Sequence, residues 1–514
     1  YWDDKSDGTA NWSQCYQPGS IPPPVGDGPS GVPDLHTILG FPCKDPYGDP
    51  RFGIDGDGSD PFKVNFNLRP NQTDQDIWGI TLDANYDTDY GTFTLILNHR
   101  DVEEDITTDT DGFNWDLFSS TRTQDFKSTQ AEFRWATTFN DNIDFLAGAF
   151  YLQDEYDVQQ FLWIFADSAL FGGGGFTRDN PLVSWGSNGQ ERWAAAGYAQ
   201  VDWHLGEKWT LNFGGRYTYE EKEDVYGMAI NDSNCPAGET PATANCNGVP
   251  FSGTDITDVE DIDPSVRFGP VDDDWSDFSP RVGVDYQVTE DIMLFAFWQR
   301  AFKSGGFVNN AGSESVFETP YDDEQVDNYE IGMRSDLWGG RLRLNVNAFY
   351  AKYQDLQRSV IRAADTSTGQ ETFTDNAADA ESYGVETSFS LIPIDSLTLF
   401  GNIGYLHIEY EDFEADITGD GIVTDNSDLD LVRAPKWDLN VGATYEFVLR
   451  DDLGSLSLTT SMSYTDDMVL TTPNDVGFYR DELTTYNASA TWESAEGQYR
   501  FSIWGKNLSD NTER

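Results

Sequence analysis

The sequence predicts an all-β fold, specifically an antiparallel transmembrane β-barrel, and three observations support that prediction. Apolar and polar residues alternate with a period of two along most of the chain, whereas helical periodicity is nearly absent. The apolar faces are aliphatic in the middle and aromatic at the ends, as expected of a lipid-facing band between interfacial girdles. Short turns and long loops alternate strictly between consecutive strands, which is typical of outer-membrane barrels.

The period-two alternation is clearest in three segments, residues 209–220, 342–350 and 437–447. In the last of these, one face carries Trp, Leu, Val, Ala, Tyr and Phe, and the other carries Asp, Asn, Gly, Thr and Glu. A soluble sandwich would also alternate. However, the opposite faces here carry Arg, Asn, Glu and Thr at depths where a packed core would hold apolar groups. The pattern therefore favours a barrel with a polar interior.

We predict sixteen strands, and the connections between consecutive strands alternate between a short turn and a long loop. The strands are expected at residues 77–87, 91–103, 128–139, 143–157, 191–205, 208–222, 277–288, 291–303, 326–337, 341–355, 381–392, 396–410, 436–449, 455–466, 481–493 and 498–508. The long loops would lie outside the cell, because outer-membrane barrels have short periplasmic turns. An open sheet would expose unpaired backbone groups to lipid, so these strands are expected to form part of a larger closed barrel.

The composition excludes several other classes of protein. The chain of 514 residues has 90 acidic and 31 basic residues, a net charge of −59, which argues against a nucleic-acid partner. Its 16 Trp, 24 Tyr and 33 Phe argue against disorder. No stretch approaches 18 consecutive apolar residues, so helical membrane spans are not expected. The chain begins without an initiator Met or signal peptide and is interpreted as the mature or interior part of a longer protein.

The four cysteines predict two local disulfides in an oxidising compartment. Cys15 and Cys43 lie in a stretch rich in Pro and Gly, and Cys235 and Cys246 bracket a short irregular segment. Neither pair has the spacing of a CxxC metal site. Four separate thiols are the alternative.

Five motifs resemble one family. Residues 196–201 and 211–222 (AGYAQV and LNFGGRYTYEEK) are similar to the mid-barrel hairpin of TonB-dependent outer-membrane receptors of the siderophore-receptor type. Four further stretches agree in order and spacing with that family: AFKSGGF at 301–307, NYEIGMRS at 328–335, SYGVE at 382–386 and KNLSD at 506–510. The resemblance covers residues from about 77 to the end of the chain.

The resemblance implies a 22-stranded barrel in the bacterial outer membrane that imports a scarce, bulky nutrient, most often a ferric siderophore. Five strands would precede the sixteen predicted here and one would follow. We therefore expect residues 1–76 to form an extracellular loop region with a disulfide, and residues 77–514 to form the barrel without its plug and closing strand. The implied partners are the TonB motor complex, outer-membrane lipid, lipopolysaccharide and a small-molecule substrate. A surface lipoprotein is a further candidate partner.

Two acidic segments are candidate calcium sites, and no other cofactor is expected. In residues 416–428, Asp416, Thr418 and Asp420 occupy alternate positions before Gly421, as in EF-hand or dockerin-type loops. The acid expected at position twelve comes one place late, at Asp428. A second candidate segment has the same spacing, with oxygen ligands at Asp55, Asp57 and Ser59. The alternative for both segments is a solvated acidic turn.

Aromatic side chains in the outer loops are candidates for stacking on a substrate. The candidate substrate-binding residues are Phe161, Trp163, Trp185, Trp275 and Phe307. Packing within the loops and the aromatic girdle is the alternative role.

No catalytic constellation is recognisable, because the chain has neither a nucleophile elbow nor an HExxH motif. An enzyme is therefore not expected. Two alternatives to an energy-coupled importer remain open. One is a calcium-stabilised surface binding or adhesion protein, and the other is a passive porin without a plug.

Overall fold

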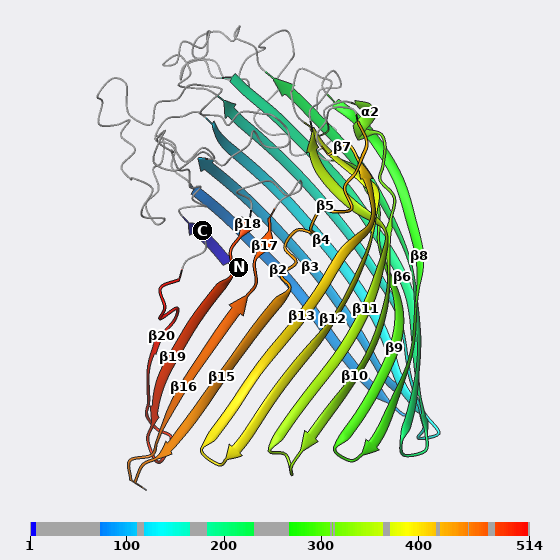
Figure 1. Ribbon diagram of the computed structural model, residues 1–514. Helices are drawn as coiled ribbons and strands as arrows, with labels where there is room; N and C mark the ends of the chain where they lie inside the picture. The colour runs from blue at the N-terminus through cyan, green and yellow to red at the C-terminus, as the bar shows by residue number, and fades with distance from the viewer. Residues whose placement is uncertain are drawn as a thin grey trace, which may run out of the picture.

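The computed structural model is a strongly curved antiparallel sheet whose strands wind around a central lumen (Figure 1). The structure describes residues 2–6, 72–109, 118–164, 182–230, 267–308, 311, 314–362, 371–417, 422–450, 452–470 and 479–511. Within these ranges the long strands follow one another around the wall in chain order, each antiparallel to the next. The predicted antiparallel barrel architecture is therefore confirmed.

Each predicted strand corresponds to one long strand of the structure. These are β2 (Gln72–Thr88), β3 (Gly91–Asp109), β4 (Phe118–Phe139), β5 (Ile143–Ile164), β6 (Leu182–Leu205), β7 (Trp209–Ile230), β8 (Arg267–Thr289), β9 (Ile292–Lys303), β10 (Glu324–Leu337), β11 (Leu342–Arg362), β12 (Glu371–Ile394), β13 (Leu397–Ala415), β15 (Trp437–Val448), β16 (Ser455–Thr465), β19 (Leu483–Glu493) and β20 (Arg500–Gly505). The shorter strands are β1 (Trp2–Ser6), β14 (Thr424–Asp425), β17 (Met468–Val469) and β18 (Tyr479–Arg480).

Several strands are longer than predicted at the end that faces the long loops. β4 begins at Phe118 and β6 at Leu182, where the sequence predicts starts at 128 and 191. The 24 residues of β6 span about 80 Å, whereas a tilted strand crosses a membrane with about 9–11 residues. The additional residues form an extension of the wall beyond the membrane. In β4 the added residues 118–127 are mostly polar, so the apolar alternation that marks a strand in the sequence is lost there although the ladder continues.

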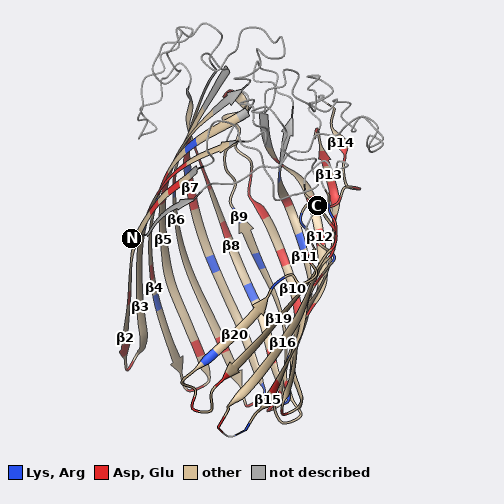
Figure 2. Cartoon of the chain, turned by 90° about the vertical axis from the view of Figure 1, so that its left-hand side faces the viewer, with Lys and Arg blue, Asp and Glu red and all other residues tan. Residues whose placement is uncertain are grey.

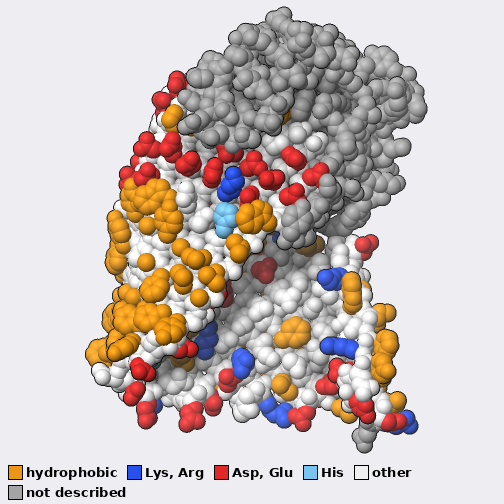
Figure 3. All heavy atoms as spheres, turned by 180° about the vertical axis from the view of Figure 1, so that it is seen from behind, with side chains coloured by type: hydrophobic (Ala, Val, Ile, Leu, Met, Phe, Trp, Pro, Cys, Tyr) orange, Lys and Arg blue, Asp and Glu red, His pale blue; other side chains and the backbone are white. Residues whose placement is uncertain are grey.

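Large apolar side chains cover the outer face of the wall at membrane depth. Figure 3 shows them gathered into a band on the outer surface, below a zone of acidic side chains. Members of this band that remain well exposed include Ile80, Leu82, Leu95, Phe133, Phe213, Val282, Leu294, Ile331, Val385 and Leu458. Because residues of the same parity share a face of a strand, the register brings these side chains together on adjacent strands, as in Leu82 opposite Leu97. This is the lipid-facing band that the sequence predicts.

The inner face is polar, with aromatic rings that lie across glycines of the neighbouring strand. Phe349 lies beside Gly384 and Phe400 beside Gly442, where an added Cβ would be 2.6 Å and 2.5 Å from the rings. A larger residue at either glycine would displace the ring, so these glycines are required for close approach and not for an unusual backbone angle. In the turns, by contrast, glycine is needed for an unusual backbone angle, as at Gly91 in the β2–β3 turn, whose φ is +112°.

The two edges of the described sheet are β1 and β20. β1 pairs with the upper part of β2, with Trp2 opposite Ile77. Within the described ranges no ladder joins β20 to β1, so closure of the barrel stays a prediction. The division into residues 1–76 and 77–514 also stays a prediction, since residues 7–71 lie outside the described ranges.

Helical structure contributes little to the described chain. The helix α2 (Glu314–Phe317) has four residues, and no helix in the described part of the chain is long and apolar enough to cross a membrane.

Candidate functional site

The connection between β9 and β10 forms a strap against the inner face of the wall extension. We call residues 304–323 the strap; residues 309, 310, 312 and 313 of it are outside the described ranges. Its two arms are held together by a β-bridge, in which the Gly306 and Tyr321 amides each donate to the other residue's carbonyl, at 3.1 Å and 2.9 Å. The strap therefore has a defined base at the mouth of the lumen.

An apolar cluster fixes the strap to β7 and β8. Phe317 of the strap is fully buried and contacts Tyr226 of β7, with ring centroids 5.8 Å apart. Gly269 has a φ of +86°, and a Cβ added there would be 3.1 Å from the Phe317 ring. The bare glycine backbone is thus the surface on which Phe317 rests.

Two of the candidate substrate-binding aromatics meet in this cluster. Trp275 of β8 and Phe307 of the strap are 6.3 Å apart in an edge-to-face arrangement. Their exposed fractions are 6% and 5%, so their rings contact protein on nearly all sides. In this structure both residues pack against other side chains, which is the role predicted from the sequence as the alternative to substrate stacking.

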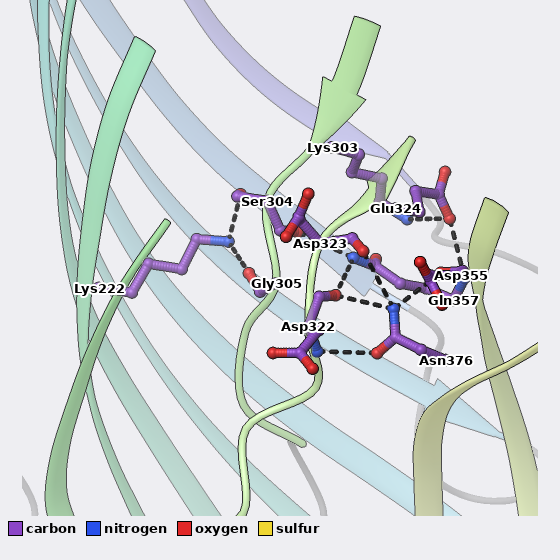
Figure 4. Close-up of polar contacts among 10 residues, drawn as sticks. All are labelled: Lys222, Lys303, Ser304, Gly305, Asp322, Asp323, Glu324, Asp355, Gln357 and Asn376. Atoms are coloured by element: carbon purple, nitrogen blue, oxygen red, sulfur yellow. Dashed lines mark hydrogen bonds and ion pairs between the residues drawn. The ribbon is translucent and has the colours of Figure 1, made fainter. Parts of the chain in front are cut away.

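Lys222 links the wall to the strap on the same side. Its Nζ donates to Ser304 Oγ at 3.0 Å and to the Gly305 carbonyl at 2.6 Å, as Figure 4 shows. Glu220 completes the link, because its carboxylate accepts from Ser304 Oγ at 2.7 Å and lies 3.3 Å from the lysine. Burial lowers the pKa of Lys222, and the Glu220 carboxylate opposes that shift. The lysine serves as a hydrogen-bonded cross-link between β7 and the strap.

Asp224 is a fully buried carboxylate two residues beyond Lys222 on the same face of β7. Asn188 donates to Oδ1 at 2.7 Å and Gln190 donates to Oδ2 at 2.6 Å. Burial raises the pKa of Asp224 to about 6, although both amide donors and Lys222 favour the charged form. Desolvation therefore outweighs the hydrogen bonds.

Two amide side chains hold the other side of the strap. Gln357 of β11 donates to the Ser304 and Asp322 carbonyls, at 2.9 Å and 3.0 Å. Asn376 of β12 accepts from the Asp322 amide at 2.7 Å and donates to the Asp355 carbonyl at 2.7 Å (Figure 4). The strap is thus fixed between β7 on one side and β11–β12 on the other.

Acidic groups surround these amide contacts. They are Asp322, Asp323, Glu324 and Asp355, with Lys303 4.0 Å from Glu324 as the neighbouring cation. Burial raises the pKa of Asp355, and the carboxylates of Asp379, Asp323 and Asp322 raise it further. This side of the mouth presents a negative potential.

Charged residues occur along the strands of the wall, where Figure 2 marks both basic and acidic positions. Arg134 and Arg216 lie on the inner face, because they alternate with the exposed Phe133 and Phe213 of the same strands. Arg134 donates to Glu132 at 2.6 Å, and Glu132 also accepts from the Tyr198 hydroxyl at 2.5 Å. Other guanidinium groups lie over aromatic rings. Arg281 is 3.9 Å from the centroid of Phe297, and Arg334 is 4.8 Å from that of Phe295. The wall thus offers charged groups and aromatic rings to the contents of the lumen.

The remaining candidate aromatics lie on strands and not in loops. Phe161 and Trp163 belong to β5 and Trp185 to β6, and the register places Phe161 opposite Trp185. Phe161 has the same parity along β5 as Tyr151, which is on the outer face. Trp275 and Phe307 are therefore in contact, and Phe161 and Trp185 are opposite each other in the β5–β6 ladder. No ring contact between described side chains links the first pair to the second. A substrate-binding role for these residues stays a prediction.

The sequence did not identify the polar residues that hold the strap, namely Lys222, Gln357 and Asn376. It also did not identify the buried hydrogen-bonded group of Asn188, Gln190 and Asp224 on β6 and β7. Lys222 and Asp224 continue the inward parity of Thr218 and Glu220 along β7. The predicted strand 208–222 already includes Lys222, whereas Asp224 joins the pattern only when β7 is extended beyond residue 222.

The calcium candidates are only partly described. Asp416 and Asp428 lie within the described ranges, whereas Thr418, Asp420, Asp55, Asp57 and Ser59 lie outside them. Among the described residues no group of three or more His, Cys, Asp or Glu side chains is placed to hold a metal ion. Nearby, the Asp425 carboxylate accepts from the amide and the hydroxyl of Ser427, at 3.0 Å and 2.6 Å. The cysteines 15, 43, 235 and 246 also fall outside the described residues.

A transmembrane wall with an apolar exterior, a polar lumen and a strapped mouth defines an outer-membrane β-barrel. A family model described as "TonB dependent receptor-like, beta-barrel" matches residues 7–508. The chain belongs to this family of outer-membrane receptors, which are transporters and not enzymes.

Individual relatives agree with this assignment. The metal-pseudopaline receptor CntO of Pseudomonas aeruginosa is 30% identical over 169 residues, which is 33% of this chain and 21% of the relative. The ferric-pyoverdine 358 receptor of Pseudomonas putida is 28% identical over 135 residues, 26% of this chain and 15% of the relative. The aligned stretches thus cover about a fifth or less of each relative.

Solved structures show the same fold. The ferric yersiniabactin uptake receptor FyuA from Yersinia pestis matches with a TM-score of 0.62 and 17% identity, over 87% of this chain and 58% of that one. The siderophore receptor PiuA from Acinetobacter baumannii matches with a TM-score of 0.60 and 15% identity, over 86% and 61%. The chain spans less than two thirds of the length of these structures.

Proposed function

We propose that this chain is the wall of an energy-coupled receptor that imports a scarce metal chelate, most simply a ferric siderophore. The single observation that carries the proposal is the family match over residues 7–508. The polar inner wall supports it, because a lumen lined in this way suits a hydrophilic cargo. Two relatives are named as receptors for metal-pseudopaline and ferric pyoverdine, and this supports a metal chelate as the cargo class.

The proposed partners follow from the same function. A TonB motor complex would act at the side of the short turns, and outer-membrane lipid and lipopolysaccharide would surround the apolar band. A plug within the lumen and further strands that close a 22-stranded barrel would complete the protein. A surface lipoprotein could assist at the mouth.

The uptake of labelled iron tests the proposal. The full-length protein is expressed in a Gram-negative strain that lacks its own siderophore receptors. Iron-55 is supplied as the complexes of the siderophores that the source bacterium secretes. We expect uptake that requires both TonB and the proton gradient.

The other outcomes identify the alternatives. Equal uptake in a strain without TonB would replace the proposal with a passive porin. Iron that binds to the surface but never enters the cell, or no iron binding, would favour a surface binding protein.

The disulfides and the calcium sites are separate proposals. A mass increase on alkylation only after reduction would establish disulfides at Cys15, Cys43, Cys235 and Cys246. Calorimetric titration with calcium, compared between the parent and an Asp416→Asn variant, would test the loop at 416–428. No heat of binding in the parent would exclude calcium there.

A further inference from the structure

Two successive register shifts interrupt the β11–β12 ladder in the wall extension. One lies between Tyr353 and Leu356, and the other lies between Leu356 and Gln357. Asp355, inside the first shift, has a φ of +54°, a left-handed backbone angle that is uncommon for a residue other than glycine. A bulge of this kind bends its strand and re-aims the side chains on it. We call residues 355–357 the β11 bulge.

The last residue of the β11 bulge holds the strap. Gln357 donates through Nε2 to the carbonyls of Ser304 and Asp322, one on each arm of the strap, at 2.9 Å and 3.0 Å. Asn376, which lies opposite Gln357 in the ladder, links Asp322 to the Asp355 carbonyl (Figure 4). Displacing either arm of the strap would therefore break hydrogen bonds to the bulge.

The middle residue of the β11 bulge belongs to an apolar cluster that is separate from the strap cluster. Leu356 is 9% exposed and lies opposite Ala378 of β12, which in turn lies opposite Phe413 of β13. Ala378 has the opposite parity to the exposed Tyr383 on β12, so the cluster is on the lumen side of the wall. The other buried members of the cluster are Ala380, Tyr410, Ile417 and Leu431.

The β13–β15 connection contributes the last two members and packs against the same wall. We call residues 416–436 the flap; residues 418–421 of it are outside the described ranges. Asn426 folds the flap back onto β13, because its backbone amide donates to the Phe413 carbonyl at 2.7 Å and its side chain donates to the Ala415 carbonyl at 3.0 Å. The flap and the strap are thus supported by consecutive residues of one bulge.

We propose that the β11 bulge couples the strap to the flap, so that the two segments open and close as one cooperative unit at the mouth of the lumen. Leu356 and Gln357 share a peptide bond. A backbone shift that releases the flap from Leu356 therefore also displaces the donor that holds the strap. The inference goes beyond the import function and does not depend on it, because the coupling is a property of the folded wall.

Hydrogen exchange on the full-length protein in detergent tests the coupling. The strap is followed at the Gly306 and Tyr321 amides, and the flap at the Asn426 and Leu429 amides, all of which donate to backbone carbonyls. Leu431→Ala leaves a cavity in the apolar cluster under the flap. We expect exchange at the flap amides to become at least about tenfold faster, because truncating a buried leucine is strongly destabilising. Coupled opening predicts a matching increase at the strap amides.

The reverse perturbation starts from the strap. Phe317→Ala removes the buried ring that packs against Tyr226 of β7. Because coupling between two sites is reciprocal, exchange at the flap amides should become faster in this variant as well.

A matched pair of leucine variants identifies the bulge as the link. Gln357→Leu removes the donors to the strap, whereas Gln354→Leu makes the same change at an exposed position of the same strand. In the Gln357→Leu background, adding Leu431→Ala should accelerate the flap but leave strap exchange within about twofold, the scatter expected of independent sites. In the Gln354→Leu background it should accelerate both segments.

Two outcomes would overturn the proposal. One is faster exchange of the flap with unchanged exchange of the strap in Leu431→Ala. The other is an equal response of the strap in the two leucine backgrounds. All variants are checked for folding by heat-modifiable migration. If Leu431→Ala does not fold, Ile417→Val removes one methyl group from the same cluster and gives the same test with a smaller increase.

The coupling and the import function fail separately. Independent exchange of the strap and the flap in a protein with TonB-dependent iron uptake would reject the coupling and retain the importer. Coupled exchange in a protein without such uptake would retain the coupling and reject the importer.

Discussion

Single residues on the inner wall set how closely adjacent strands can pack. Phe349 of β11 occupies the space where Gly384 of β12 has no side chain. This relation between a ring and a glycine recurs around the wall, and it supplies the aromatic surfaces on which Arg281 and Arg334 rest.

Gly384→Val should destabilise the barrel by about 1–3 kcal/mol, because the new side chain would collide with the Phe349 ring and overpack the wall. The control is Gly404→Val on the next strand, where an added Cβ meets only the Asp438 carbonyl, at 3.6 Å. The measurement is urea unfolding followed by tryptophan fluorescence. Equal unfolding midpoints for the two variants would contradict this packing.

The buried Asp224 should make opening of the strap depend on pH. Burial raises its pKa to about 6 in the folded wall against 3.8 ordinarily. Tyr321 of the strap, whose pKa is raised by burial, lies close enough for the Asp224 charge to raise it further. Opening the strap should expose the carboxylate to water, so the closed structure is expected to bind the proton more tightly than an opened one. The free energy of opening should therefore rise as the pH falls from about 7 to about 4, by up to about 3 kcal/mol.

Hydrogen exchange at the Gly306 and Tyr321 amides, corrected for the intrinsic rate, measures this opening. Asp224→Asn should remove the dependence on pH between these limits. A parent protein whose opening becomes easier in acid would contradict the assignment.

At the scale of elements, each strand has a lipid face and a lumen face that alternate residue by residue. Leu82 of β2 is 52% exposed on the outer face, and its neighbour Thr81 faces inward, where it accepts from Asn98 at 2.7 Å. Adjacent residues along a strand thus face lipid on the outside and the polar lumen on the inside.

Leu82→Arg should reduce the stability of the folded barrel in lipid by about 2–4 kcal/mol, because its charge would lie near the bilayer midplane. Thr81→Arg provides the same residue on the lumen side and should cost far less. Folding titrations in phospholipid vesicles compare the two. A larger loss for Thr81→Arg would mean that the faces are reversed.

The strands and their order could be predicted from the sequence because apolar alternation records the lipid-facing band. The extension beyond the membrane could not, since segments such as 118–127 of β4 are polar on both faces and resemble loops in the sequence. The strap was missed for a related reason. Lys222, Gln357 and Asn376 are distant in sequence and become neighbours only when β7, β11 and β12 curve around one lumen.

At the scale of the whole molecule, the charge distribution matches an outer-membrane receptor. Figure 3 shows acidic residues gathered above the apolar band on the outside. Arg134, Arg216 and Arg281 lie on the inner face, because they alternate with the exposed Phe133, Phe213 and Val282 of the same strands. The family resemblance came from short motifs such as 328–335 and 382–386, whose glycines and glutamates belong to the inner wall. Composition alone, dominated by a net charge of −59, indicated none of this.

The central claim is that the wall spans the outer membrane with its long connections outside the cell. Cysteine accessibility in intact cells tests it most directly, with single cysteines introduced at Ser427, in the β13–β15 connection, and at Trp338, in the β10–β11 turn. A membrane-impermeant maleimide should label Ser427→Cys above the level of the parent protein, and should label Trp338→Cys only after the cells are broken. Labelling of Trp338→Cys in intact cells, with Ser427→Cys protected, would contradict the orientation and with it the route proposed for the cargo.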